Sequence, residues 1–133
     1  GDFTSMEYES FFFDCVIDVF SSCTLDKYSG QEYIKEVSRV LKKKGKFFSY
    51  FPSKKSDMFN CKTRKLFDSD TLMSVKQKTA YTTDHAIRFM TLNQYSKLLT
   101  ANGFKLNYKE EVMRTYFSGK EKFYFLVIDA IKE

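Results

Sequence analysis

Tryptophan is absent from this chain of 133 residues, and proline and histidine occur once each. The cysteines at positions 15, 23 and 61 form no close pair and, with the single histidine, give no metal-ligand spacing. We therefore expect no structural zinc site and no bound metal. The odd number of cysteines favours free thiols in a reducing compartment, so we expect a cytoplasmic protein. No apolar run reaches the length of a membrane span.

Arginine is also scarce, with four residues among 22 basic ones, although the net charge is +5. No basic stripe is rich in arginine or interleaved with aromatic residues, so a solvated lysine surface is favoured over a nucleic-acid site. A weaker alternative, an enzyme that modifies nucleic acid, rests on that charge and on Lys62, Arg64 and Lys65. The hydrophobic share of 43% indicates one packed domain spanning residues 1–133.

The first third of the chain predicts a strand, a helix and a second strand. Residues 11–20 (FFFDCVIDVF) form a nearly continuous apolar run, which is typical of a strand buried on both faces. A capping box of Ser29 and Glu32 predicts a helix that ends with a lysine run at 42–44 before Gly45. Residues 46–51 (KFFSYF) predict the second strand. Short connections make this a parallel, right-handed βαβ unit.

The rest of the chain predicts an insertion, a helix and a hairpin. Residues 53–90 are polar and irregular, and a segment of this length favours a lid or a substrate-binding insertion. Thr91 begins a helix that ends before Gly103, and an alternating strand follows. Residues 123–131 are apolar on both faces. They predict a central strand, paired through a turn with the strand before it.

This element order, with its final antiparallel hairpin, resembles the second half of the class I S-adenosylmethionine-dependent methyltransferases. In that family the sheet order is 3-2-1-4-5-7-6, with strand 7 antiparallel. The segment GDF…FDCVID (residues 1–18) is similar to the family's GD…FD.VID, and EVSRVLKKKGKFF (36–48) to its E..RVLKPGG.F. Residues 49–57 and Arg88-Phe89 resemble a small-molecule-type subset. The resemblance implies an α/β fold, half of a Rossmann-like sheet with strands 4-5-7-6 and flanking helices.

The sequence departs from the family in one respect that concerns the cofactor. It has five glycines and no G-x-G, so the glycine-rich loop that receives the methionine end of S-adenosylmethionine is missing. The acidic residue that binds the ribose is missing too. We therefore expect an N-terminally incomplete methyltransferase for a small-molecule acceptor, with its activity in isolation left open. The alternative is a non-enzymatic, truncated module that pairs with another chain or with itself.

The resemblance also implies site residues. Asp2 would accept a hydrogen bond from the adenine amine and Phe3 would flank the ring, unless Asp2 is merely a frayed terminal residue. Asp18 lies toward the carboxyl end of the first strand, where ligands bind in open α/β sheets. It would orient the acceptor or act as general base, or else cap a helix or loop. Five further candidates for acceptor contacts have ordinary packing or surface roles as their alternatives: Tyr50, Ser53, His85, Arg88 and Tyr116.

The first strand raises a problem of exposure. In the family it lies beside strand 1, which this sequence lacks, so its apolar residues would form an open sheet edge. Open apolar edges promote pairing with other chains. We therefore expect a homodimer that continues the sheet at this edge, or a longer parent chain.

Overall fold

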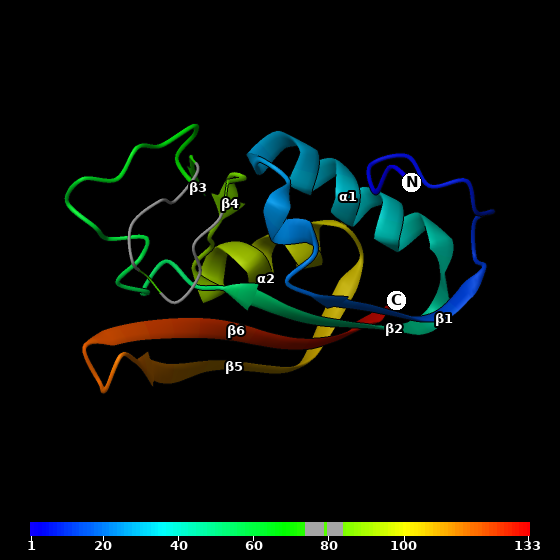
Figure 1. Cartoon of the computed structure of the whole chain (residues 1–133). Helices are drawn as coiled ribbons and strands as arrows, with labels where there is room; N and C mark the ends of the chain where they lie inside the picture. Colours follow the sequence, from blue (N-terminus) through cyan, green and yellow to red (C-terminus); the bar gives the residue numbers. More distant parts are fainter. Residues whose placement is uncertain (74–78, 80–83) are drawn as a thin grey trace.

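The computed structural model describes residues 1–73, 79 and 84–133. Its main sheet has four strands in the order β1-β2-β6-β5 (Figure 1). β1 (Phe13–Val19) runs parallel to β2 (Leu41–Pro52), and β6 (Glu121–Lys132) is antiparallel to both β2 and β5 (Phe104–Tyr116). This is the predicted 4-5-7-6 order, and β6 is the central antiparallel strand that its apolar sequence predicted.

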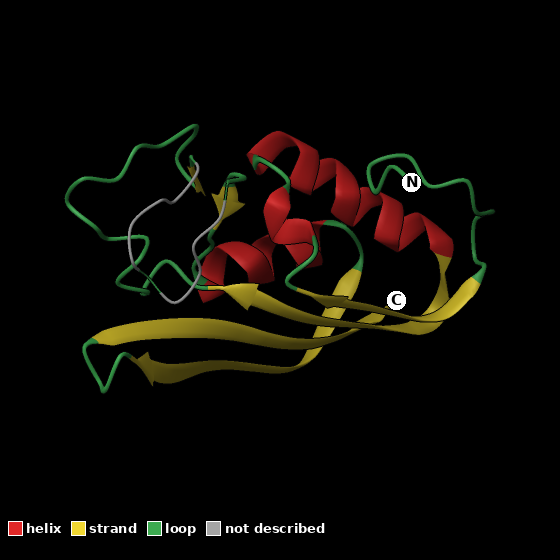
Figure 2. Cartoon of the chain, in the orientation of Figure 1, coloured by secondary structure: helices red, strands yellow, loops and turns green. Residues whose placement is uncertain are grey.

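The helices cover one face of this sheet (Figure 2). α1 (Lys27–Val40) and α2 (Leu92–Ala101) lie on that face, and a short 3-10 helix, η1 (Ser22–Thr24), follows β1. The core between the layers contains Ile34 and Val37 of α1, Phe47 of β2 and Ile128 of β6. Among the described residues no helix covers the opposite face, so the molecule has two layers.

α1 begins and ends at other residues than the sequence predicted. The N-cap is Asp26, whose carboxylate accepts a hydrogen bond from the backbone N–H of Ser29 at 2.8 Å. The predicted Ser29–Glu32 capping box is therefore wrong, because Ser29 already lies inside the first turn. The helix ends at Val40, so the lysines at 42–44 belong to β2 rather than to the last helical turn.

α2 follows its prediction more closely. The Thr91 hydroxyl accepts a hydrogen bond from the N–H of Gln94, and the Gln94 side chain accepts one from the N–H of Thr91. This reciprocal pair is the predicted capping box. Tyr95 on the buried face shares a hydrogen bond with the hydroxyl of Ser49, 2.6 Å away, which joins the helix to the middle of β2.

β1 is shorter than predicted and is buried on one face only. Asp18 faces the helix layer and is buried, whereas 68% of the Ile17 side chain and 52% of Val19 are exposed. β1 pairs with β2 alone, so its other edge is open among the described residues. The expected burial on both faces is therefore wrong, and the expected open apolar edge is confirmed.

The predicted insertion, residues 53–90, lies partly outside the described residues. Its described part contains β3 (Thr71–Leu72) and β4 (Ile87–Arg88), which pair in a small antiparallel sheet. Met58, Phe59 and Leu72 are buried and join the main hydrophobic core. Much of the described segment is thus packed structure, while its role as a lid or substrate insertion stays a prediction.

Candidate cofactor and substrate site

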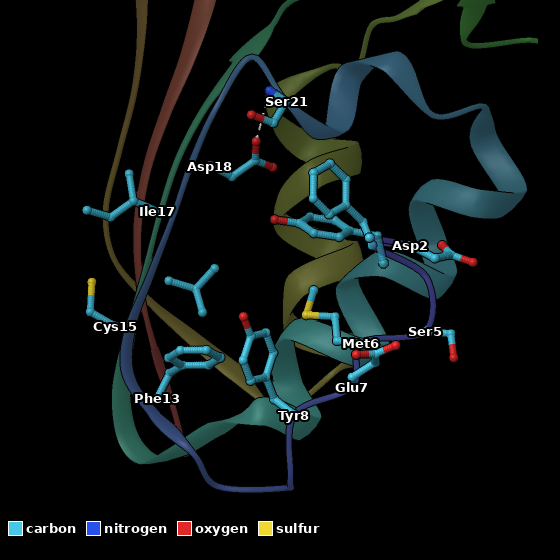
Figure 3. A pocket seen from close by; sticks show the side chains of 14 residues that line it. Asp2, Ser5, Met6, Glu7, Tyr8, Phe13, Cys15, Ile17, Asp18 and Ser21 are labelled. Carbon is cyan, nitrogen blue, oxygen red and sulfur yellow. Dashed lines mark hydrogen bonds between the residues drawn. The ribbon is translucent and has the colours of Figure 1, made fainter.

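A pocket of about 650 Å³ lies between the N-terminal segment, β1 and α1. Its walls come from residues 1–8, from the length of β1, from Ser21 and from Tyr33 of α1. Figure 3 shows Phe13 and Asp18 on one side of β1 and Cys15 and Ile17 on the other, and all four line the pocket. The fold therefore brings Asp2, Phe3 and Asp18, which lie at the two ends of one predicted motif, to one cavity.

Asp2 is ordered by a local turn rather than frayed. One carboxylate oxygen accepts hydrogen bonds from the backbone N–H of Thr4 at 2.8 Å and from its hydroxyl at 2.7 Å. These bonds hold the pKa of Asp2 below its ordinary value, so the side chain is an anionic acceptor at neutral pH. The neighbouring ring of Phe3 lies 6.0 Å from the ring of Tyr33 and adds an aromatic wall.

Asp18 is buried at the carboxyl end of β1 and organises the turn that follows. Its Oδ1 accepts hydrogen bonds from the backbone N–H groups of Ser21 and Ser22, both at 3.1 Å, and its Oδ2 accepts one from the Ser22 hydroxyl. Asp18 is therefore a loop cap, which was one of its two predicted roles. It also lines the pocket, so its catalytic role stays a prediction.

Tyr33 is a pocket residue that the sequence analysis missed. Burial raises the pKa of its hydroxyl, and the negative charge of Asp18 raises it further. The hydroxyl therefore remains protonated close to Asp18. Tyr33 lies next to Ile34 on the apolar face of α1, so its sequence position indicates only a packing role. Its proximity to Asp18 becomes visible in the fold, where α1 lies beside the end of β1.

The backbone after Asp18 is strained. Phe20 has φ of 53°, a left-handed conformation that bulky residues rarely adopt. Its ring packs edge-on against Tyr50 and Phe125, with centroids 5.4 Å and 5.3 Å away. This aromatic packing holds the bend that aims the N–H groups of Ser21 and Ser22 at Asp18.

A pair of charged residues on α1 holds the N-terminal segment, and it too was missed. The guanidinium of Arg39 donates to the carbonyl oxygens of Met6 and Tyr8 at 3.0 Å and 2.8 Å. Glu36 accepts a hydrogen bond from the N–H of Met6 at 2.8 Å and forms an ion pair with Arg39. The sequence contained the signal, the E..R spacing of residues 36–39, but only as part of a motif without an assigned contact.

Comparisons with known proteins identify the architecture. No family model and no curated protein sequence matches the chain. A solved structure of a SAM-dependent methyltransferase from Methanosarcina mazei superimposes with a TM-score of 0.80 at 19% identity, over 99% of this chain and 65% of the other. The chain has the class I methyltransferase fold.

Two further solved structures share this methyltransferase fold. A 1,6-didemethyltoxoflavin-N1-methyltransferase from Burkholderia thailandensis matches with a TM-score of 0.63 at 17% identity, over 98% of this chain and 48% of its own. The cyclase SpnF matches with a TM-score of 0.64 at 16% identity, over 99% of this chain and 54% of the SpnF chain. The chain thus spans about half to two thirds of the length of these proteins.

Tyr50 and Ser53, two of the predicted acceptor contacts, lie apart at the end of β2. Tyr50 lies on the sheet face away from the helices, where its ring stacks on Phe125 with centroids 5.0 Å apart. Ser53 follows the last residue of β2 and is fully buried, and its hydroxyl donates to Glu111 at 2.5 Å. The proposed contacts of both residues with an acceptor stay predictions.

Arg88, another predicted acceptor contact, lies in β4 and is buried. Its side chain is 2% exposed, and its guanidinium carbon lies 5.0 Å from the centroid of the Phe51 ring. Nη1 donates to the backbone carbonyl of Asp26 at 3.2 Å. Burial lowers the pKa of the guanidinium from its very high ordinary value. Contact of Arg88 with an acceptor stays a prediction, one that requires this buried side chain to become accessible.

The remaining candidates also lie apart from the pocket lining. Tyr116 ends β5 opposite Glu121, and the guanidinium carbon of Arg114 lies 5.6 Å from its ring centroid. His85 is exposed just before β4. Their proposed contacts with an acceptor stay predictions.

Three general properties of the chain complete the description. In the described ranges no group of three or more His, Cys, Asp or Glu residues could hold a metal ion. No disulfide joins the cysteines at 15, 23 and 61. No helix within the described residues is both long and apolar enough to cross a bilayer.

Proposed function

We propose that this chain supplies the substrate-side half of an S-adenosylmethionine-dependent methyltransferase that acts on a small molecule. One observation carries the proposal, namely the pocket in which Asp2, Phe3 and Asp18 meet within a methyltransferase fold. The pocket fits an adenosyl group chemically, since it combines an anionic acceptor at Asp2 with aromatic walls at Phe3 and Tyr33.

The residues of the chain would act mainly by positioning. Asp2 would accept the hydrogen bond of the adenine amine, and Phe3 would flank the ring. When bound, the cofactor supplies an electrophilic methyl group on a sulfonium. Asp18, held by hydrogen bonds from Ser21 and Ser22, would orient the acceptor nucleophile or take its proton. Alignment accounts for most of the acceleration in such a transfer, so no further catalytic group is needed.

The small-molecule acceptor is proposed from the sequence resemblance and from the Burkholderia neighbour, which was solved with bound 1,6-didemethyltoxoflavin and S-adenosylhomocysteine. A fold alone does not determine chemistry, as the cyclase SpnF illustrates. Tyr50, Ser53, His85, Arg88 and Tyr116 remain proposed acceptor contacts. A nucleic-acid acceptor has weaker support, since it rests on net charge.

The site needs a further wall, which we propose is supplied through β1. The glycine-rich loop is missing from the sequence, and the outer edge of β1, which borders the pocket, pairs with no described strand. A second copy of the chain that pairs along this edge, or additional residues of a longer parent, would cover it. The alternative function is a non-enzymatic module that pairs with another chain or with itself, and the exposed Ile17 and Val19 favour it.

Calorimetric titration with S-adenosylhomocysteine tests the proposal. We expect micromolar binding to the wild-type chain and a loss of about tenfold or more for Asp2→Asn, because the amide presents a donor beside the adenine amine and lacks the charge. Asp14→Asn is the matched control, since Asp14 is an exposed carboxylate on β1 outside the pocket lining. Absence of binding by the wild-type chain at all concentrations would favour the non-enzymatic module, or restrict the activity to a longer parent.

A further inference from the structure

The N-terminal wall of the pocket has little regular structure of its own. Residues 1–12 precede the first strand, and the backbone bond from the N–H of Ser5 to Asp2 lies within the segment itself. Only near its end do the N–H groups of Phe11 and Phe12 donate to the carbonyl oxygens of Arg39 and Val40, at 3.0 Å and 2.8 Å. A segment without backbone hydrogen bonds to a neighbouring strand is free to move unless side chains hold it, because ordering each residue costs conformational entropy.

Glu36 and Arg39 provide the contacts that a neighbouring strand would otherwise provide. The N–H of Met6 donates to Glu36, and the carbonyl oxygens of Met6 and Tyr8 accept from Arg39, as does the hydroxyl of Ser10 at 3.4 Å. The pair is fixed in turn by two bonds, from Nε of Arg39 to Oε1 of Glu36 at 2.8 Å and from Nη2 to Oε2 at 2.9 Å. This bidentate geometry is specific to the guanidinium, which a lysine cannot reproduce.

A second ion pair on α1 differs from the Glu36–Arg39 pair in its exposure and in its contacts with the N-terminal segment. Lys35 and Glu32 form an i,i+3 pair at 2.9 Å, with Lys35 62% exposed. Its hydrogen bond joins the two side chains to each other on the solvent side of α1. In the Glu36–Arg39 pair the side chains are 18% and 35% exposed, and both reach across to the backbone of residues 6–8.

We infer that Glu36 and Arg39 form a clamp that holds residues 1–10 against α1 and so positions Asp2 and Phe3 for the ligand of the pocket. The nature of that ligand rests on the proposed function, whereas the clamp itself rests only on the contacts of Glu36 and Arg39. Neither clamp residue lines the pocket. They are positioning residues that act through the segment.

Amide hydrogen exchange and titration with S-adenosylhomocysteine, measured on the same variants, test the clamp. In Arg39→Gln we expect the hydrogen-bonded amides of Ser5, Met6, Phe11 and Phe12 to exchange about tenfold faster or more, and affinity to fall by a similar factor, because several charge-assisted bonds are lost. Arg39→Lys should lose part of the exchange protection and part of the affinity, since lysine keeps the positive charge but cannot form the bidentate contact of the guanidinium. Lys35→Gln, the matched control, should change neither.

Each outcome decides a separate point. Unchanged exchange of these four amides in Arg39→Gln would overturn the clamp, and faster exchange with unchanged affinity would overturn its positioning role. Should Arg39→Gln fail to fold, Glu36→Gln keeps the side-chain shape and removes the charge, and it should give the same changes to a smaller extent. A wild-type chain that binds no S-adenosylhomocysteine would count against the proposed ligand, while the exchange data would still decide the clamp.

Discussion

Among single residues, Gly30 and Arg88 depend on each other most directly. A Cβ atom at position 30 would lie 1.1 Å from Nη1 of Arg88, so the guanidinium occupies the space of the missing side chain. In an open helix interior, alanine is better than glycine by about 1 kcal/mol. Here we expect Gly30→Ala to destabilise the chain by about 1–3 kcal/mol, because the buried guanidinium must move.

Urea unfolding of Gly30→Ala measures this effect, with Gln31→Ala on the exposed side of α1 as the control. The double variant Gly30→Ala/Arg88→Ala should be less destabilised than the sum of the two single variants, because the clash is gone. A Gly30→Ala chain as stable as the wild type would show that Arg88 is not held where the structure places it.

The Glu36 carboxylate gives the clamp a dependence on pH. Hydrogen bonding from Arg39 holds the pKa of Glu36 below its ordinary value of 4.5. A carboxyl whose pKa is lower in the folded state stabilises the fold above its unfolded pKa, and this contribution is lost as the pH falls through the folded pKa. The stability difference between wild type and Glu36→Gln should therefore be present near neutral pH and shrink below about pH 4.5. Unfolding free energies measured across this range check it, and a constant difference would contradict it.

The sequence indicated three residues of the pocket but not Tyr33 or the burial of Arg88. Asp2, Phe3 and Asp18 belong to one motif of the family, so the resemblance named all three, and the structure places them in the lining of one cavity. The burial of Arg88 could not be predicted, because it depends on Gly30, a distant residue that leaves room for the guanidinium. Burial of a polar side chain leaves no mark in the local pattern.

At the scale of elements, the start of α1 illustrates two competing signals. Asp26 and Ser29 are both good N-cap residues, three positions apart, and Glu32 after Ser29 favours the wrong one. The structure predicts that Asp26→Ala costs about 1 kcal/mol, whereas Ser29→Ala costs only a few tenths. Urea unfolding of the two variants tests this, and the reverse order of effects would restore the Ser29 cap.

The opposite end of α1 escaped prediction for a different reason. A lysine run followed by glycine is typical of a helix C-terminus. Here Leu41 is already in β2 and is fully buried, so packing of this leucine determines where the strand begins. Tertiary burial thus outweighs the local signal of three lysines and a glycine.

At the scale of the whole molecule, the order of the sheet was predictable and its exposure follows from it. Loop lengths and periodicity predicted the hairpin of β5 and β6 and the parallel β1–β2 unit, and the family resemblance implied how the two units join. The resulting order leaves β1 at an edge, with Ile17 and Val19 exposed. What lies beside β1 is not encoded in the described residues, so partner and oligomeric state remain proposals.

Ile17→Lys tests the proposed pairing along this edge. A lysine on an edge strand disfavours association, so the variant should shift a concentration-dependent dimer toward monomer in sedimentation equilibrium. Tyr28→Lys is the matched control, because Tyr28 is also a highly exposed apolar residue, at 72%, but lies on α1. A wild-type chain that is monomeric throughout, or an Ile17→Lys chain that associates equally well, would contradict the proposal.

The single parallel pairing of β1 also has a kinetic consequence. β5 and β6 are joined by a short turn and can pair locally, whereas β1 reaches β2 only after α1 has closed the connection between them. Pairings that close longer loops tend to form later in folding. We therefore expect destabilising changes in β1, such as Val16→Ala, to speed unfolding more than they slow refolding in stopped-flow experiments. The strand that carries Asp18 would then be the last part of the sheet to assemble.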